Sequence, residues 1–218
     1  MQNSFSKIAT IYMAIAAIIA WLSLTSQLYI LLHNVPGNGL TYLQAAARFL
    51  IFFTILTNLL VAISLTSILV APQSKWGQFF SKSTTLTAIA LYIFIVGLVY
   101  NIILRNIWEP VGLQKWVDEG LHVVVPLLFI FFWLFFVPTG NLKWRHAFSW
   151  LIYPAVYLIY ALLRGAMEGF YPYPFIDASQ LGYAQVLMNA TGLLLVFIIG
   201  GFLFIGVDKL KGSILKPA

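Results

Sequence analysis

The chain has 218 residues, of which 61% are hydrophobic and only 8% are charged. Water-soluble domains carry about 25% charged residues, so this composition excludes a soluble globular protein and indicates a polytopic membrane protein. The formal net charge is +6, but Lys and Arg are thinly spread and lie where membrane topology requires them, so we expect no nucleic-acid partner. The absence of cysteine excludes disulfides, thiolate nucleophiles and cysteine-ligated metal sites.

Six apolar runs are each long enough for a membrane-spanning helix, which needs roughly 20 residues. We expect the spans at residues 7–33, 42–70, 84–104, 119–137, 147–163 and 183–207. The first run is longer than the core of a signal peptide, so we expect it to be retained. The connections are short and rich in proline and turn residues. The sequence therefore predicts an all-α protein with six transmembrane helices in a single domain, residues 1–218.

Basic residues are distributed unequally between the two sides of the expected helices. Eight of the twelve lie at the chain ends and in the second and fourth connections: Lys7, Lys75, Lys82, Lys143, Arg145, Lys209, Lys211 and Lys216. Cytoplasmic segments carry the excess of Lys and Arg. Both termini are therefore predicted to be cytoplasmic, and we expect a multi-pass protein of the plasma membrane.

Polar residues in and beside the expected spans gather in the outer half of the membrane. Five of the six helices contribute to this set: Arg48, Thr54, Thr57, Asn58, Asn101, Arg105, Asp118, Glu119, His122, Arg164, Glu168 and Asn189. Ionisable groups are costly in hydrocarbon and are candidates for function by default. A shared cavity that opens outward explains their common depth.

His122 is the expected chemical centre. Asp118 and Glu119 precede it by four and three residues, so either carboxylate borders the same side of the helix. Pro126 removes a backbone donor and clashes with the carbonyl of residue 122, which predicts a loosened helix that aims the ring at the second span. There, Thr54, Thr57 and Asn58 form one polar stripe. The four-residue spacing of Arg164 and Glu168 also predicts an ion pair.

This set of residues suits a nucleophile and a general base. A threonine hydroxyl becomes nucleophilic when a histidine accepts its proton, and Thr54 and Thr57 are both candidates. Asp118 is a candidate to orient the ring, and Asn58, Asn101 or a nearby arginine to stabilise an oxyanion. Apolar walls and a polar mouth suit a lipid substrate, and we expect no cofactor and no metal.

Other interpretations of the same residues remain open. Threonine in a membrane helix often bonds its own backbone, a lone histidine can pair with a carboxylate, and boundary Arg and Lys side chains snorkel. A two-haem cytochrome needs paired histidines on facing helices, whereas His33 and His146 are expected near the end of the first span and in a connection. Zinc has sufficient ligands in His122, Asp118, Glu119 and Glu168. The same groups suit a lipid-binding or proton-coupled transport protein.

Several short motifs resemble one membrane family. Trp116, Gly120 and His122, followed by apolar residues and a proline, resemble the histidine helix of the androgen-induced and androgen-dependent six-span membrane proteins. Arg48-Phe49-Leu50 followed by Phe53-Thr54-Ile55-Leu56 resembles their basic-aromatic run before a threonine. Tyr173-Pro174-Phe175 is similar to their Tyr-Pro-Phe before the last helix.

The resemblance implies a threonine hydrolase that cleaves fatty acid esters of hydroxy fatty acids, with Thr54 as nucleophile and His122 as base. Phe53-Thr54-Ile55-Leu56-Thr57-Asn58 and Arg164-Gly165-Ala166 look closer to a prokaryotic-type branch, whose members mostly lack an assigned activity. In the hydrolases the threonine follows the basic-aromatic run directly. Here Ile51 takes that place and the threonine comes three residues later, so Thr57 stays a second candidate.

Overall fold

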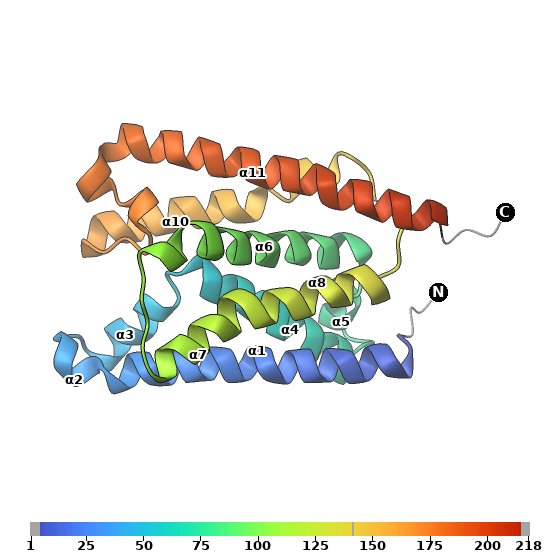
Figure 1. Ribbon diagram of the computed structural model, residues 1–218, viewed down its shortest axis with the longest axis horizontal. Helices are drawn as coiled ribbons and strands as arrows, with labels where there is room; N and C mark the ends of the chain where they lie inside the picture. Colours follow the sequence, from blue (N-terminus) through green and yellow to red (C-terminus); the bar gives the residue numbers. More distant parts are fainter. Residues whose placement is uncertain (1–4, 141, 215–218) are drawn as a thin grey trace. The chain divides into compact units, whose positions relative to one another are not determined.

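The computed structural model describes residues 5–140 and 142–214 (Figure 1). Within these ranges the regular secondary structure is entirely helical. Six helical segments are long and apolar enough to cross a membrane: Lys7–Gly37, Phe53–Val70, Ser83–Asn106, Leu113–Phe136, His146–Glu168 and Ala178–Ile214. This confirms an all-α chain with six candidate spans. Lys216, which entered the prediction of topology, lies outside the described residues.

The chain divides into two compact units, Met1–Pro138 and Thr139–Ala218. The first unit contains four of the candidate spans and the second contains two. Each unit is described separately below. The organisation as a single domain stays a prediction.

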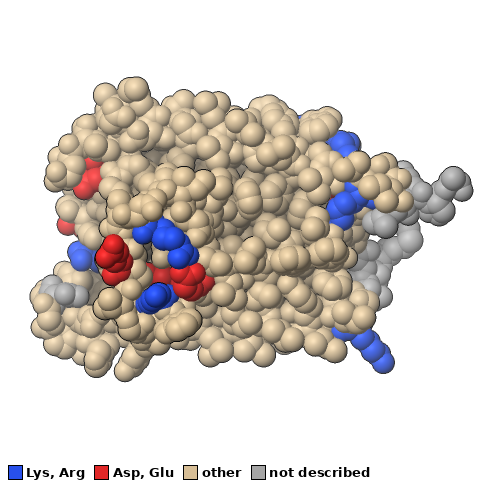
Figure 2. All heavy atoms as spheres, viewed as in Figure 1, with Lys and Arg blue, Asp and Glu red and all other residues tan. Residues whose placement is uncertain are grey.

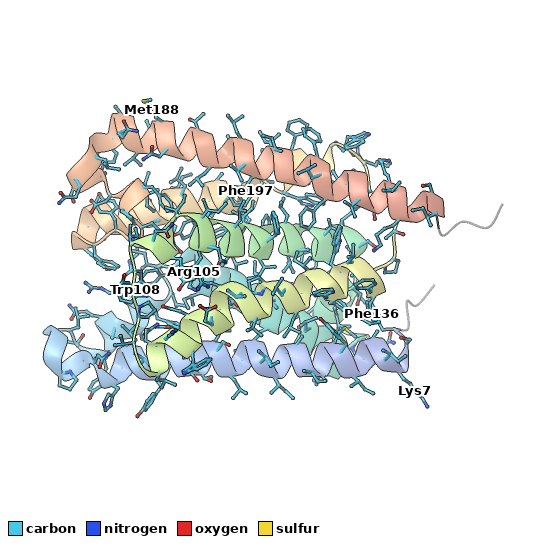
Figure 3. The ribbon with its side chains drawn as sticks, in the orientation of Figure 1. Lys7, Arg105, Trp108, Phe136, Met188 and Phe197 are labelled. Carbon is cyan, nitrogen blue, oxygen red and sulfur yellow. The ribbon has the colours of Figure 1, made fainter. Side chains whose placement is uncertain are left out.

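In the first unit, α1 (Lys7–His33) packs along α4 (Phe53–Val70), and α6 (Ser83–Ile102) packs against α4 and α8 (Val125–Phe136). Small side chains line the buried face of α1, namely Ala9, Ala16, Ala17, Ala20 and Ser23. Such residues let helix backbones approach closely. In a bilayer the hydrophobic effect does not favour contact between helices over contact with lipid, so this close packing drives their association. Lys7 and Phe136 lie at one end of this unit, and Arg105 and Trp108 at the other (Figure 3).

The second expected span is interrupted, so the prediction of one helix over residues 42–70 is wrong. α3 (Tyr42–Phe49) ends at Phe49 with Leu50 as its C-cap, and α4 begins after Phe52, whose backbone is extended. Phe49, Ile51 and Phe53 are all buried. In an unbroken helix the second of these would face away from the other two, so the break allows all three to enter the core. Arg48 consequently lies in α3, and Thr54 lies in the first turn of α4.

The fourth span consists of three consecutive pieces: α7 (Leu113–Glu119), a π-helical turn η2 (Gly120–Val124) and α8. It begins six residues before the predicted start at residue 119, because polar residues of α7 hide the helix from a hydropathy-based reading. The remaining short helices of this unit are α2 (Val35–Asn38), α5 (Lys75–Phe80) and η1 (Leu104–Asn106). The π turn places a local irregularity at His122.

The second unit contains α9 (His146–Ser149), α10 (Ile152–Glu168), η3 (Pro174–Ile176) and α11 (Ala178–Ile214). Gly182 in α11 has the non-helical angles φ 73° and ψ 155°, so a kink divides α11 there. The long part of α11 begins after this kink, where the sixth span was predicted to start. Asp208 is buried, and its Oδ2 accepts the N–H groups of Gly140 at 3.0 Å and Leu142 at 3.3 Å. This carboxylate therefore fixes the connection that precedes α9.

Large apolar side chains cover the outer surfaces of the long helices. Many are more than half exposed, including Ile18, Phe135, Ile159 and Leu203. Figure 2 shows a face whose middle part carries no charged side chains. Such a surface is unsuited to water and is the surface expected of helices in contact with lipid.

Candidate functional site

Thr54 and His122 meet in the first unit, although 68 residues separate them. Thr54 Oγ1 lies 3.3 Å from His122 Nε2. The threonine is buried near the start of α4, and the partly exposed histidine sits in the middle of η2. Thr57, the other predicted candidate, is fully buried one turn further along α4. The hydrogen bond from the α4 stripe to the imidazole therefore identifies Thr54 as the better-placed hydroxyl.

The other ring nitrogen of His122 defines the tautomer. Nδ1 lies 2.9 Å from the main-chain carbonyl oxygen of Asp118. A carbonyl can only accept a hydrogen bond, so Nδ1 carries the hydrogen. A neutral ring then presents a lone pair at Nε2, which accepts the hydrogen of the Thr54 hydroxyl. This is the arrangement that a general base requires before it takes a proton.

The π turn explains why the ring can reach these partners. The N–H of Val125 bonds to Gly120, five residues earlier. In this pattern the carbonyl of Leu121 would accept from residue 126, but Pro126 has no N–H. Asn58 Nδ2 donates to that carbonyl at 3.1 Å. The loosening predicted around the proline is thus present, and a side chain from α4 compensates for the missing backbone donor.

Asn58 holds the two sides of the site together. Its Nδ2 also donates to the carbonyl of Thr54 at 2.9 Å. Both amide hydrogens are therefore used by backbone, so Asn58 has none left to offer an oxyanion. The side chain is fully buried, and in the described part of the chain its Oδ1 accepts no hydrogen bond. Asn58 acts as a brace between α4 and η2.

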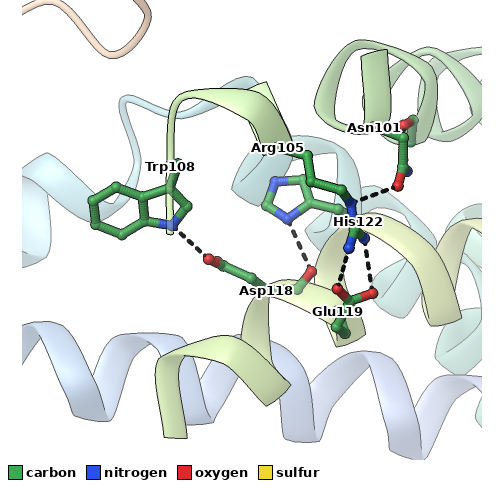
Figure 4. Close-up of polar contacts among 7 residues, drawn as sticks. Asn101, Arg105, Trp108, Asp118, Glu119 and His122 are labelled. Carbon is green, nitrogen blue, oxygen red and sulfur yellow. Dashed lines mark hydrogen bonds and ion pairs between the residues drawn. The ribbon is translucent and has the colours of Figure 1, made fainter. Parts of the chain in front are cut away.

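The Asp118 side chain faces away from the imidazole (Figure 4). Its buried carboxylate accepts Trp108 Nε1–H at 2.6 Å and Gln114 Nε2–H at 2.9 Å. Gln114 also donates to Gln27 of α1 at 2.8 Å. The orienting role expected of the carboxylate is therefore filled by the carbonyl of the same residue. The carboxylate instead ties the segment before α7 to α7 itself.

A cluster of polar side chains around Arg105 lies beside Tyr100. Arg105 forms an ion pair with Glu119 at 2.7 Å, and its Nε donates to Asn101 Oδ1 at 3.0 Å (Figure 4). The Tyr100 ring stacks on the imidazole, with centroids 3.9 Å apart and an interplanar angle of 11°. Arg105 Cζ lies 5.1 Å from the centroid of the same tyrosine ring. The structure thus joins Asn101, Arg105 and Glu119 to His122 through Tyr100.

The remaining predicted residues lie elsewhere. Arg48 is in the last turn of α3. Arg164 and Glu168 form the predicted ion pair within α10, and Arg164 also donates to the Tyr160 hydroxyl at 3.1 Å. Asn189 of α11 donates to the carbonyl of Phe175 at 2.9 Å. These last three belong to the second unit, where these contacts of Arg164 and Glu168 lie within α10 and Asn189 joins α11 to η3.

Three residues of the site were not anticipated from the sequence: Tyr100, Trp108 and Gln114. An aromatic residue at the end of a span is the usual mark of the membrane interface, so nothing in the pattern distinguished Tyr100 from a belt residue. Gln114 precedes Asp118 by four residues, and this spacing was a signal that could have been used.

No group of three or more His, Asp or Glu residues within 5–140 and 142–214 is arranged to hold a metal ion. Comparison with known protein families, curated proteins and solved structures finds no match to this chain. The resemblance to the six-span threonine hydrolases therefore stays a prediction, and any functional assignment depends on the geometry of the site.

Proposed function

We propose that this protein is an integral membrane lipid ester hydrolase in which Thr54 is the nucleophile and His122 the general base. The observation that carries the proposal is the 3.3 Å contact between Thr54 Oγ1 and His122 Nε2, with Nδ1 held by a carbonyl on the opposite side of the ring. Fatty acid esters of hydroxy fatty acids, or related lipids, are the proposed substrate class, because the motifs around both residues resemble those hydrolases.

The reaction proceeds in two stages. Thr54 Oγ1 attacks the ester carbonyl carbon as Nε2 takes the hydroxyl proton, and the resulting tetrahedral intermediate collapses when the carbon–oxygen bond to the alcohol breaks. His122 returns its proton to the departing alkoxide. Water then attacks the acyl-threonine and gives a proton to Nε2. The fatty acid leaves, and the proton passes back to Thr54, so one ester and one water yield one acid and one alcohol.

The start of α4 supplies the stabilisation of the oxyanion. The first N–H groups of an α-helix have no intrahelical acceptor; here the N–H of Leu56 bonds to the carbonyl of Phe52 at 3.1 Å. Phe52 provides no side-chain cap. The N–H of Ile55, next to the nucleophile, therefore has no acceptor within the helix. An N–H at a helix start favours the negative charge that develops in acyl transfer.

The proposed topology places both termini in the cytoplasm and the Thr54–His122 end of the first unit toward the outside of the plasma membrane. The unequal distribution of basic residues supports this orientation. Lys7 lies at the opposite end of the unit from Arg105 and Trp108 (Figure 3). The site would then receive lipid from the outer leaflet.

Purified protein in detergent should release fatty acid from an ester of a hydroxy fatty acid and from a long-chain p-nitrophenyl ester. Thr54→Val, which removes the nucleophile, should abolish turnover, and His122→Ala should lower it by about 10²- to 10⁴-fold, which is the contribution of a positioned base. Thr57→Val is the matched control on the same helix and should keep turnover close to wild type. A fluorophosphonate should label the wild type and Thr57→Val, but not Thr54→Val.

Folded Thr54→Val and His122→Ala proteins that both hydrolyse esters at the wild-type rate would remove the proposal. Loss of labelling in Thr57→Val alone would instead transfer the nucleophile to that residue. Flux of a small molecule or lipid across proteoliposomes without ester turnover would favour the transport interpretation of the same residues.

A further inference from the structure

Tyr100 lies in the last full turn of α6 and contacts the proposed base through its ring. The residue is only 3% exposed. Its ring is parallel to the His122 imidazole at a centroid distance of 3.9 Å. Gly97, one turn earlier, allows this approach, because a Cβ there would meet the His122 carbonyl at 3.1 Å and Pro126 at 3.4 Å. α6 is therefore in direct contact with the irregular turn that carries the histidine.

The hydroxyl group of Tyr100 differs from that of a typical buried tyrosine. A buried tyrosine hydroxyl normally finds a hydrogen-bond partner. Tyr100 Oη makes no hydrogen bond to any residue in the described ranges, yet it is not among the polar atoms that packing encloses completely. Tyr12, a tyrosine of the same unit, shows the usual behaviour, since its hydroxyl donates to the carbonyl of Leu128 at 3.0 Å.

The stack limits this hydroxyl to the neighbourhood of the imidazole. The phenol is rigid, so an oxygen on a ring stacked directly over the imidazole lies beside that imidazole. The Nε2 of the same imidazole faces Thr54 Oγ1. An ester whose carbonyl carbon reaches Thr54 binds beside the same imidazole on which Tyr100 stacks. Phenol hydroxyls donate hydrogen bonds, and the carbonyl oxygen of an ester accepts them.

We infer that Tyr100 is a further catalytic residue, whose hydroxyl donates a hydrogen bond to the carbonyl oxygen of the bound ester beside the His122–Thr54 pair. This inference rests on the proposed hydrolase function and adds a side-chain donor to the Ile55 N–H. The alternative role for Tyr100 is purely structural, with the ring supporting the imidazole. Removal of the hydroxyl alone separates the two, because phenylalanine keeps the stack.

Tyr100→Phe should lower kcat for a long-chain p-nitrophenyl ester by about 10²-fold, the usual effect of removing one oxyanion donor. KM should change little, because the donor acts on charge that develops in the transition state. Fluorophosphonate should also label Thr54 more slowly in this variant, while its thermal unfolding should match that of the wild type. Tyr12→Phe, which removes an internally bonded hydroxyl, is the matched control and should keep kcat and the labelling rate.

Wild-type kcat in Tyr100→Phe, measured alongside an inactive Thr54→Val, would overturn the role of Tyr100 and leave the hydrolase intact. Equal losses in Tyr100→Phe and Tyr12→Phe would also overturn it, because the effect would not be specific to the site. A wild-type protein that neither turns over esters nor reacts with fluorophosphonate would remove both the proposed function and this inference.

Discussion

The main-chain carbonyl of Asp118 holds the His122 ring, whereas the carboxylate of Asp118 bonds to other side chains. Asp118 accepts two side-chain donors, Trp108 and Gln114, through separate oxygens. An amide in its place has only one oxygen and would direct hydrogens toward one of the two donors. The structure therefore separates the effect of this residue on stability from its effect on the imidazole.

Asp118→Asn should reduce the free energy of unfolding by about 1–3 kcal/mol, the cost of leaving a buried donor unsatisfied. Ester turnover should remain close to wild type, because the carbonyl still holds Nδ1. Thermal unfolding and turnover, measured on the same preparation, check both parts. The control is Glu119→Gln, which breaks a partly exposed ion pair and should cost no more than about 1 kcal/mol.

A contrary result has a clear signature. Replacement of a triad carboxylate by its amide lowers kcat by about 10⁴-fold. A loss of that size in folded Asp118→Asn would show that the carboxylate, and not the carbonyl, orients the ring.

At the scale of single residues, the sequence was informative where spacing carries the signal. We predicted that His122 faces a hydroxyl of the second span, because the polar residues of both helices are expected at the same depth in the membrane. In the structure Thr54 lies within hydrogen-bond distance of this ring. The Arg164–Glu168 pair followed from four-residue spacing and is present. Tyr100 was missed, because a ring stack between two helices depends on their rotation about their own axes, which spacing along one helix does not determine.

Among the elements, the contact between α1 and η2 is the tightest beside the histidine. A Cβ at Gly120 would lie 2.6 Å from Ser23 Oγ and 3.3 Å from Ser23 Cβ. Ser23 is buried and its hydroxyl donates to the carbonyl of Ile19 at 2.9 Å, so this oxygen cannot move away freely. The absence of a side chain at Gly120 is therefore a condition for the position of the π turn.

Gly120→Ala should lower the free energy of unfolding by about 1–3 kcal/mol, the usual cost of overpacking. In a Ser23→Ala background the same change should cost less, because the closest contact, to Oγ, has been removed. Unfolding of the two single variants and the double variant in detergent gives the coupling directly. Gly206→Ala on α11 is the control, since a Cβ there meets nothing within 4 Å. Strictly additive effects of Gly120→Ala and Ser23→Ala would contradict the contact.

The six spans were predictable because the length of an apolar run alone identifies a membrane helix. Their interruptions were not. The break between α3 and α4 falls inside the apolar sequence Leu50-Ile51-Phe52, where hydropathy is uniform and gives no sign of an end. The π turn at His122 was foreshadowed only by Pro126, which predicts a disturbance in the helix without specifying its form.

For the molecule as a whole, the absence of cysteine makes orientation directly measurable. Gln73 follows α4 and Glu109 follows α6, and both are exposed. In intact cells, a membrane-impermeant maleimide should label Glu109→Cys, but should label Gln73→Cys only after permeabilisation. The reason is that Lys75 and Lys82 predict a cytoplasmic position for the connection that contains them. Ester turnover in each variant confirms that it is folded.

The inverse labelling pattern would reverse the orientation of the protein and place the Thr54–His122 pair toward the cytoplasm. Labelling of both cysteines from outside intact cells would contradict α6 as a membrane span. The proposed chemistry of the pair does not depend on this outcome, but the leaflet from which we propose that lipid enters does.

The carbonyl behind His122 belongs to the polypeptide itself, and every amino acid carries one. Substitution at position 118 therefore leaves the acceptor in place, whereas a change in chain length does not. Each α-helical residue advances the direction of a side chain by about 100°, so deletion of one residue from η2 would restore regular pitch and swing the imidazole away from Thr54. The contact between Thr54 and His122 should thus tolerate substitutions in this stretch better than an insertion or a deletion.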